Sequence, residues 1–78
     1  MNKSNHPAYK EMVRDYKGWL KLRKGTVEAI KLNERLANSN HTDRKFFREI
    51  ATENKARLRK IDRNIKQYRT AMTNFRAY

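Results

Sequence analysis

The spacing of apolar residues in the second half of the chain constrains its fold more than any other feature. From Phe47 to Phe75 the seam positions fall at alternating steps of four and three, with one polar exception: Phe47, Ala51, Asn54, Leu58, Ile61, Ile65, Tyr68, Met72 and Phe75. This spacing is typical of a helix that packs a continuous apolar seam against another helix. The polar member, Asn54, either fixes the register of the seam or reaches solvent at its edge.

The first half of the chain carries the same spacing less cleanly. Its seam has two charged exceptions and runs through Tyr9, Val13, Tyr16, Leu20, Arg23, Val27, Ile30, Glu34 and Ala37. Pro7 suits the first turn of a helix, where its missing N–H costs nothing. The segment NSNHTD is the densest cluster of turn and capping residues. We expect the N-cap of the following helix at Thr42 or Asp43.

These patterns predict an all-α fold, an antiparallel two-helix hairpin with a coiled-coil-like seam. The helices are expected at about 7–38 and 43–76, with a turn at about 38–42, so that the chain 1–78 forms a single small helical domain. The alternative is a three-helix bundle in which the first helix is broken at Gly25. We prefer the continuous helix because the apolar and basic stripes keep their phase through this glycine.

Length and charge limit the classes of function. A chain of 78 residues without cysteine has no disulfides to support a thin core, so its stability must come from regular helices or from a partner. Twenty Lys and Arg against eight Asp and Glu give a formal charge of +12, which favours nucleic acid or an acidic protein as partner. With no signal peptide and no apolar stretch of the roughly 18 residues that span a membrane, we expect a soluble cytoplasmic protein. Attachment of the basic amphipathic segment 8–24 to an anionic membrane surface is a third and weaker hypothesis.

The cations of the first predicted helix are aligned on one face. They recur beside the seam at Lys10, Arg14, Lys17, Lys21, Lys24, Lys31 and Arg35, with Glu28 as the one acid in the row. If the seam occupies heptad positions a and d, these residues are at e and b, where the second helix adds Arg48, Lys55, Arg59, Lys66, Arg69 and Arg76. In an antiparallel pair the e positions lie side by side, so we expect like charges to face each other. Asp62 is the one acid at these positions and the one residue expected to reduce their repulsion. An anion relieves such repulsion, so this flank is predicted to bind a polyanion.

The opposite flank of the first helix is too apolar for a lone hairpin in water. The residues expected to form a protein interface there are Met12, Trp19, Leu22, Leu36, Ile50 and Tyr78. A second copy of the chain, giving a homodimer, or a different protein is expected to cover them. Gly18 and Gly25 lie on the outer face of the same helix, either as tolerated defects or as a place where another molecule approaches the backbone.

No arrangement of residues indicates catalysis. No nucleophile has a base within reach in sequence, no glycine-rich phosphate loop follows a strand, and the two histidines have no second ligand at helical spacing. We therefore expect neither enzymatic activity nor a metal or cofactor. The first hypothesis is a small basic protein that binds DNA or RNA through phosphates. The alternative is a small accessory or inhibitory protein, of the type that phages encode, that docks its basic helical face on an acidic surface of a larger protein machine.

Overall fold

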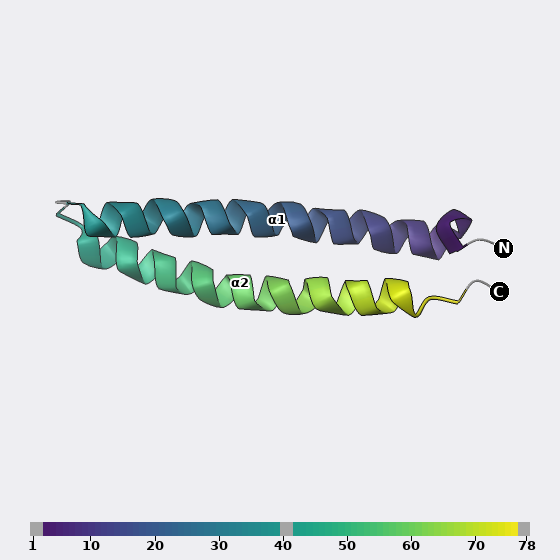
Figure 1. Ribbon diagram of the computed structural model, residues 1–78. Helices are drawn as coiled ribbons and strands as arrows, with labels where there is room; N and C mark the ends of the chain where they lie inside the picture. Colours follow the sequence, from purple (N-terminus) through teal and green to yellow (C-terminus); the bar gives the residue numbers. More distant parts are fainter. Residues whose placement is uncertain (1–2, 40–41, 77–78) are drawn as a thin grey trace.

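The computed structural model describes residues 3–39 and 42–76 and shows two long antiparallel helices (Figure 1). A short 3-10 helix, η1 (Lys3–Asn5), precedes α1 (Pro7–Asn38), and α2 (Arg44–Thr73) returns beside it. The helices pack along their length into a rod about 60 Å long and 15 Å by 12 Å across, measured between Cα atoms. The predicted helical hairpin is confirmed.

The first helix begins as predicted and has no break. His6 is the N-cap, and its Nδ1 accepts a hydrogen bond from the Ala8 N–H at 3.1 Å, while Pro7 occupies the first turn. The helix continues through Gly25 to Asn38, so the three-helix alternative is wrong. No glycine among the described residues has a positive φ angle, and neither glycine of α1 is therefore required by the backbone conformation.

The second helix is shorter than predicted at its C-terminal end. Asp43 is its N-cap, in agreement with the sequence. Two of the five residues of the predicted turn 38–42, Asn40 and His41, lie outside the described residues. The predicted end near residue 76 is wrong because α2 stops at Thr73 and Asn74 caps it. Threonine and asparagine have low helix propensity, and asparagine is favoured where helices end.

The residues beyond α2 pack against the start of α1. The Phe75 ring lies edge-on to the His6 ring with the centroids 5.1 Å apart, and 5.6 Å from the Tyr9 ring centroid. Lys3 Nζ donates a hydrogen bond to the Met72 carbonyl oxygen at 3.0 Å. Phe75 thus packs as a seam residue, as predicted, although the helix has already ended.

The core is a thin apolar seam between the two helices. Its buried apolar residues are Ile30, Ala37, Ala51, Ile61 and Ile65, of which Ile61 is the most enclosed with 2% of its surface exposed. All remaining seam positions predicted for the second helix are half-buried: Phe47, Asn54, Leu58, Tyr68, Met72 and Phe75. The predicted periodicity is therefore confirmed in this half of the chain, and the half-buried Asn54 lies at the edge of the seam.

The seam of α1 departs from the prediction near the middle of the helix. Leu20 is 37% exposed and Arg23 is exposed, whereas Thr26, outside the predicted seam, is only 6% exposed. The Thr26 hydroxyl donates to the Leu22 carbonyl oxygen at 2.9 Å, which satisfies this polar group inside the contact. α1 is thus turned about its axis, so that the side carrying Thr26 faces α2 and Arg23 moves to the edge.

The two glycines of α1 lower the stability of the hairpin. A Cβ atom added at Gly18 or Gly25 would meet no atom within 4 Å, so alanine fits at either position. Because glycine costs about 1 kcal/mol relative to alanine inside a helix, we expect Gly18→Ala and Gly25→Ala each to raise the free energy of unfolding by about 0.5 to 1 kcal/mol. Thermal unfolding followed by circular dichroism should show a rise of a few degrees for each variant. A lower melting temperature would contradict the open surroundings of these glycines.

Candidate nucleic-acid interface

Seven cations of α1 form an exposed row, called the basic stripe below: Lys10, Arg14, Lys17, Lys21, Lys24, Lys31 and Arg35. Because the helix is unbroken at Gly25, the row stays on one face over about 38 Å, at 1.5 Å per residue. Neither of the two ion pairs found among the described residues includes a member of the stripe. Its charges are therefore open to solvent and to an anionic ligand.

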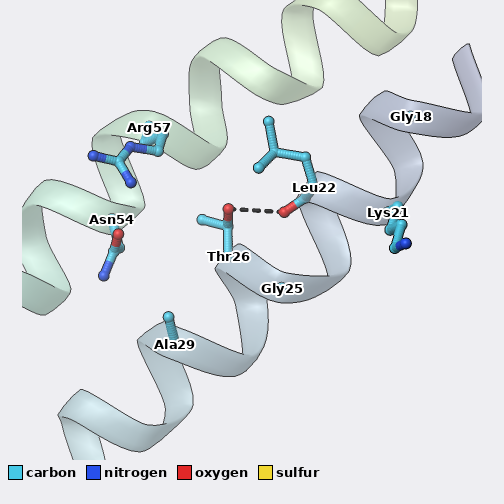
Figure 2. Close-up of a pocket in the computed structure, with 8 residues that line it drawn as sticks. All are labelled: Gly18, Lys21, Leu22, Gly25, Thr26, Ala29, Asn54 and Arg57. Atoms are coloured by element: carbon cyan, nitrogen blue, oxygen red, sulfur yellow. Dashed lines mark hydrogen bonds between the residues drawn. The ribbon is translucent and has the colours of Figure 1, made fainter. Parts of the chain in front are cut away.

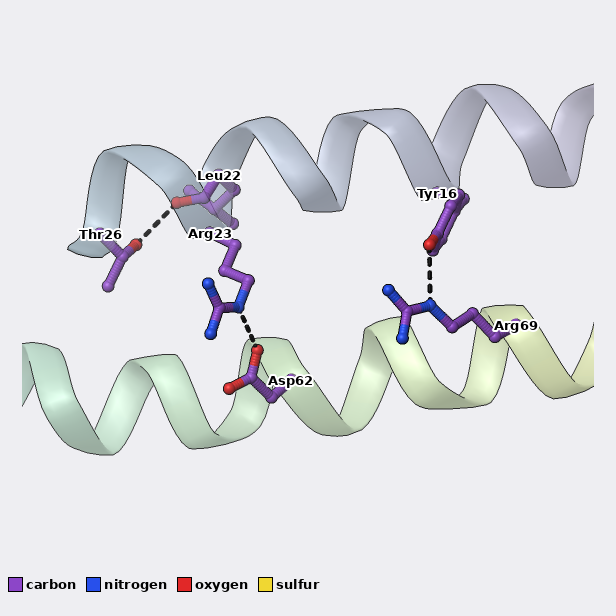
Figure 3. A network of polar contacts seen from close by, with 6 residues as sticks. All are labelled: Tyr16, Leu22, Arg23, Thr26, Asp62 and Arg69. Atoms are coloured by element: carbon purple, nitrogen blue, oxygen red, sulfur yellow. Dashed lines mark hydrogen bonds and ion pairs between the residues drawn. The ribbon is translucent and has the colours of Figure 1, made fainter. Parts of the chain in front are cut away.

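The cations predicted as site residues on the second helix are exposed as well: Arg48, Lys55, Arg59, Lys66, Arg69 and Arg76. Two of them have partners across the hairpin. Lys55 Nζ lies 3.1 Å from Glu34 Oε1. Arg69 Nε donates to the Tyr16 hydroxyl at 2.8 Å, with its guanidinium carbon 5.8 Å from the centroid of the same ring (Figure 3). Arg76 follows the end of α2 and therefore leaves the predicted helical row.

The flank predicted to bring like charges together instead pairs opposite charges. Arg23 Nε lies 2.7 Å from Asp62 Oδ1 (Figure 3), and Glu34 meets Lys55 farther along the same flank. The rotation of α1 is the reason, because the e positions of α2 face seam positions of α1 rather than its e positions. The expectation of like charges facing each other nearly throughout is wrong.

The two cross-helix ion pairs contribute little to the stability of the hairpin. In the pair formed by Arg23 and Asp62 the side chains are 45% and 47% exposed, and those of Lys55 and Glu34 are 53% and 47% exposed. Ion pairs this exposed contribute about 0.2 to 1 kcal/mol and weaken with salt. A signal for one of them is present in the sequence, since facing residues of an antiparallel hairpin lie at similar distances from the turn, as Arg23 and Asp62 do. Glu34 lies much closer to the end of α1 than Lys55 lies to the start of α2, so sequence distance does not reveal that pair.

The hairpin itself covers part of the predicted protein interface. Met12, Trp19, Leu36 and Ile50 are half-buried, whereas Leu22 is 48% exposed. The last predicted member, Tyr78, lies outside the described residues. Trp19 therefore packs partly within the hairpin, and the most accessible apolar surface of this flank is the stretch around Leu22.

No group of three or more His, Asp or Glu side chains within 3–39 and 42–76 is placed to hold a metal ion. No family model, curated protein or solved structure matches the chain. None of the described helices is both long enough and apolar enough to cross a bilayer. The exposed cations and the surface that the two helices form are the features that bear on function.

Proposed function

We propose that the chain is a small nucleic-acid-binding protein that contacts phosphates through the basic stripe and catalyses no reaction. The observation that supports this most strongly is the alignment of seven exposed cations on one face of an unbroken helix. A set of cations scattered for solubility has no need of a common face. A linear row of positive charge is complementary to a linear polyanion.

The dimensions of the basic stripe suit a nucleic-acid backbone. Duplex DNA carries one phosphate charge for about every 1.7 Å of its axis, so the roughly 38 Å of the stripe meets more phosphates than it has cations. Each lysine or arginine in the row is then able to reach a phosphate oxygen. Arg59 and Lys66 of α2 are also exposed and belong to neither ion pair, so α2 offers further cations to an anionic ligand.

The shape of the hairpin favours contacts to the backbone over reading of bases. Both helices are long and pack against each other along their length, and no short recognition helix projects from the described residues. Phosphate contacts position a protein but carry little sequence information. We therefore expect affinities that depend strongly on salt and weakly on nucleotide sequence.

Charge reversal within the stripe tests the proposal. Lys17→Glu combined with Lys24→Glu replaces two exposed cations with acids, so binding of labelled duplex DNA and RNA should fall more than about 100-fold, because each lost phosphate contact costs about tenfold at about 0.1 M salt. Helicity measured by circular dichroism should stay the same. Unchanged affinity for both polymers would exclude the stripe as the site. A wild-type chain that binds an acidic protein but neither polymer would favour the interaction-protein alternative.

A further inference from the structure

A second surface of the hairpin lies apart from most of the basic stripe. It is a groove of about 520 Å³ between the helices, lined by Gly18, Lys21, Leu22, Gly25, Thr26, Ala29, Asn54 and Arg57 (Figure 2). All of these except Asn54 and Arg57 belong to α1. The proposed function uses one lining residue, Lys21, and leaves the rest of the groove without a role.

The groove is open because small residues of α1, Gly18, Gly25 and Ala29, form part of its lining. The space above both glycines is open, since a Cβ atom on either would meet nothing within 4 Å. The packing of the hairpin therefore does not require glycine at these positions, although each lowers the stability of the helix. Backbone exposed in this way allows a side chain or a second helix to approach closely.

Large apolar side chains lie between the glycines and beyond them on the same face of α1. Leu22 is 48% exposed, Leu32 is 50% exposed and Leu36 is half-buried. Together with the small residues they form a second apolar row at steps of four and three, separate from the seam against α2: Gly18, Leu22, Gly25, Ala29, Leu32 and Leu36. This row spans about 27 Å at 1.5 Å per residue, which is about five turns of a partner helix.

The charge around the groove indicates which partner fits. Its lining includes the cations Lys21 from α1 and Arg57 from α2, and no acidic residue. A second copy of the chain would bring its own +12 charge against these cations. A helix with an apolar stripe and acidic flanks would instead place leucine-sized side chains over the glycines and carboxylates near Lys21 and Arg57.

We propose that this groove binds an acidic amphipathic helix of a partner protein. The proposal goes beyond nucleic-acid binding and does not depend on it, because Lys21 is the one member of the basic stripe that lines the groove. A chain with both surfaces would link an acidic protein to a nucleic acid.

A synthetic peptide provides the direct test. The probe is a labelled helical peptide of about five turns with leucines on one stripe and glutamates elsewhere, and its control has lysines in place of the glutamates. Fluorescence anisotropy should show binding of the glutamate peptide to the full chain and none of the lysine peptide. Gly18→Leu with Gly25→Leu fills the groove and should weaken binding more than about tenfold, whereas Thr52→Leu on the exposed surface of α2 should not.

Three results would overturn the proposal. One is failure of the glutamate peptide to bind the folded chain, and another is equal binding by the wild type and the Gly18→Leu, Gly25→Leu variant. The third is sedimentation of the wild type as a dimer that this variant dissociates, because a second copy would then occupy the groove. Duplex DNA binding should be the same in the variant and the wild type, so the outcome is separable from that of the nucleic-acid proposal.

Discussion

Replacing Ile61 with alanine is expected to lower the free energy of unfolding by about 2 to 5 kcal/mol, the largest stability effect of any single substitution considered for this chain. Ile61 is the largest fully buried side chain, and its exposed fraction is 2%. Truncation removes apolar contacts and leaves a cavity that two rigid helices cannot close. The total free energy of unfolding of a domain of this size is only about 4 to 12 kcal/mol, so the substitution removes a large part of it.

Leu32→Ala is the matched control for this substitution. It truncates a side chain of the same size as isoleucine, but at a position of α1 where the side chain is 50% exposed. Leucine and alanine both favour helix, so the substitution leaves helix propensity nearly unchanged. We expect it to cost less than about 1 kcal/mol. Thermal unfolding by circular dichroism should separate the two variants by roughly 10 °C. Equal melting temperatures would show that the seam around Ile61 is not packed as described.

Neutralising three lysines of the basic stripe is expected to weaken nucleic-acid binding by roughly 100- to 1,000-fold at about 0.1 M salt. The variant combines Lys17→Gln, Lys24→Gln and Lys31→Gln, all exposed and all at the same heptad position of α1. On duplex DNA each phosphate contact changes the logarithm of the affinity by about 0.9 for a tenfold change in salt. Three lost contacts therefore account for the expected loss.

The chain offers a control with the same change in net charge. Arg57→Gln, Lys60→Gln and Arg63→Gln remove three exposed cations from α2, none of which belongs to the stripe, although Arg57 shares the groove with Lys21. If position matters, this variant should lose less than about tenfold in affinity, through the weaker overall field alone. Equal losses in the two variants would mean that net charge, and not the aligned row, causes binding. Both variants should keep wild-type helicity, because all six residues are exposed.

The fold was predictable in the half of the chain where the pattern is strict. Every seam position from Phe47 to Phe75 is buried or half-buried. A regular apolar row on one side of a helix fixes the side that packs against the partner helix. The first half was less predictable. Its seam includes Arg23 and Glu34, and the rotation that buries Thr26 depends on contacts with α2 that sequence spacing does not reveal.

The candidate site also has a part that the sequence predicts and a part that it does not. The exposure of the basic stripe followed from helical geometry alone, since one continuous helix places Lys10 and Arg35 on the same face. Which α2 cations have partners could not be predicted from helical geometry. Lys55 pairs with Glu34, and Arg69 donates a hydrogen bond to Tyr16 across the hairpin. Pairing of this kind depends on the rotation of one helix against the other, a tertiary property.

The most direct test of the account is the affinity of the wild-type chain for labelled duplex DNA and duplex RNA across about 50 to 200 mM salt. Binding through the basic stripe predicts a linear fall of log K with log salt, with a slope between about −4 and −6 on DNA if most of the stripe meets phosphates. The variant lacking Lys17, Lys24 and Lys31 should show a slope shallower by about 2 to 3. Absence of binding to both polymers at 50 mM salt, or a slope that the three substitutions leave unchanged, would contradict it.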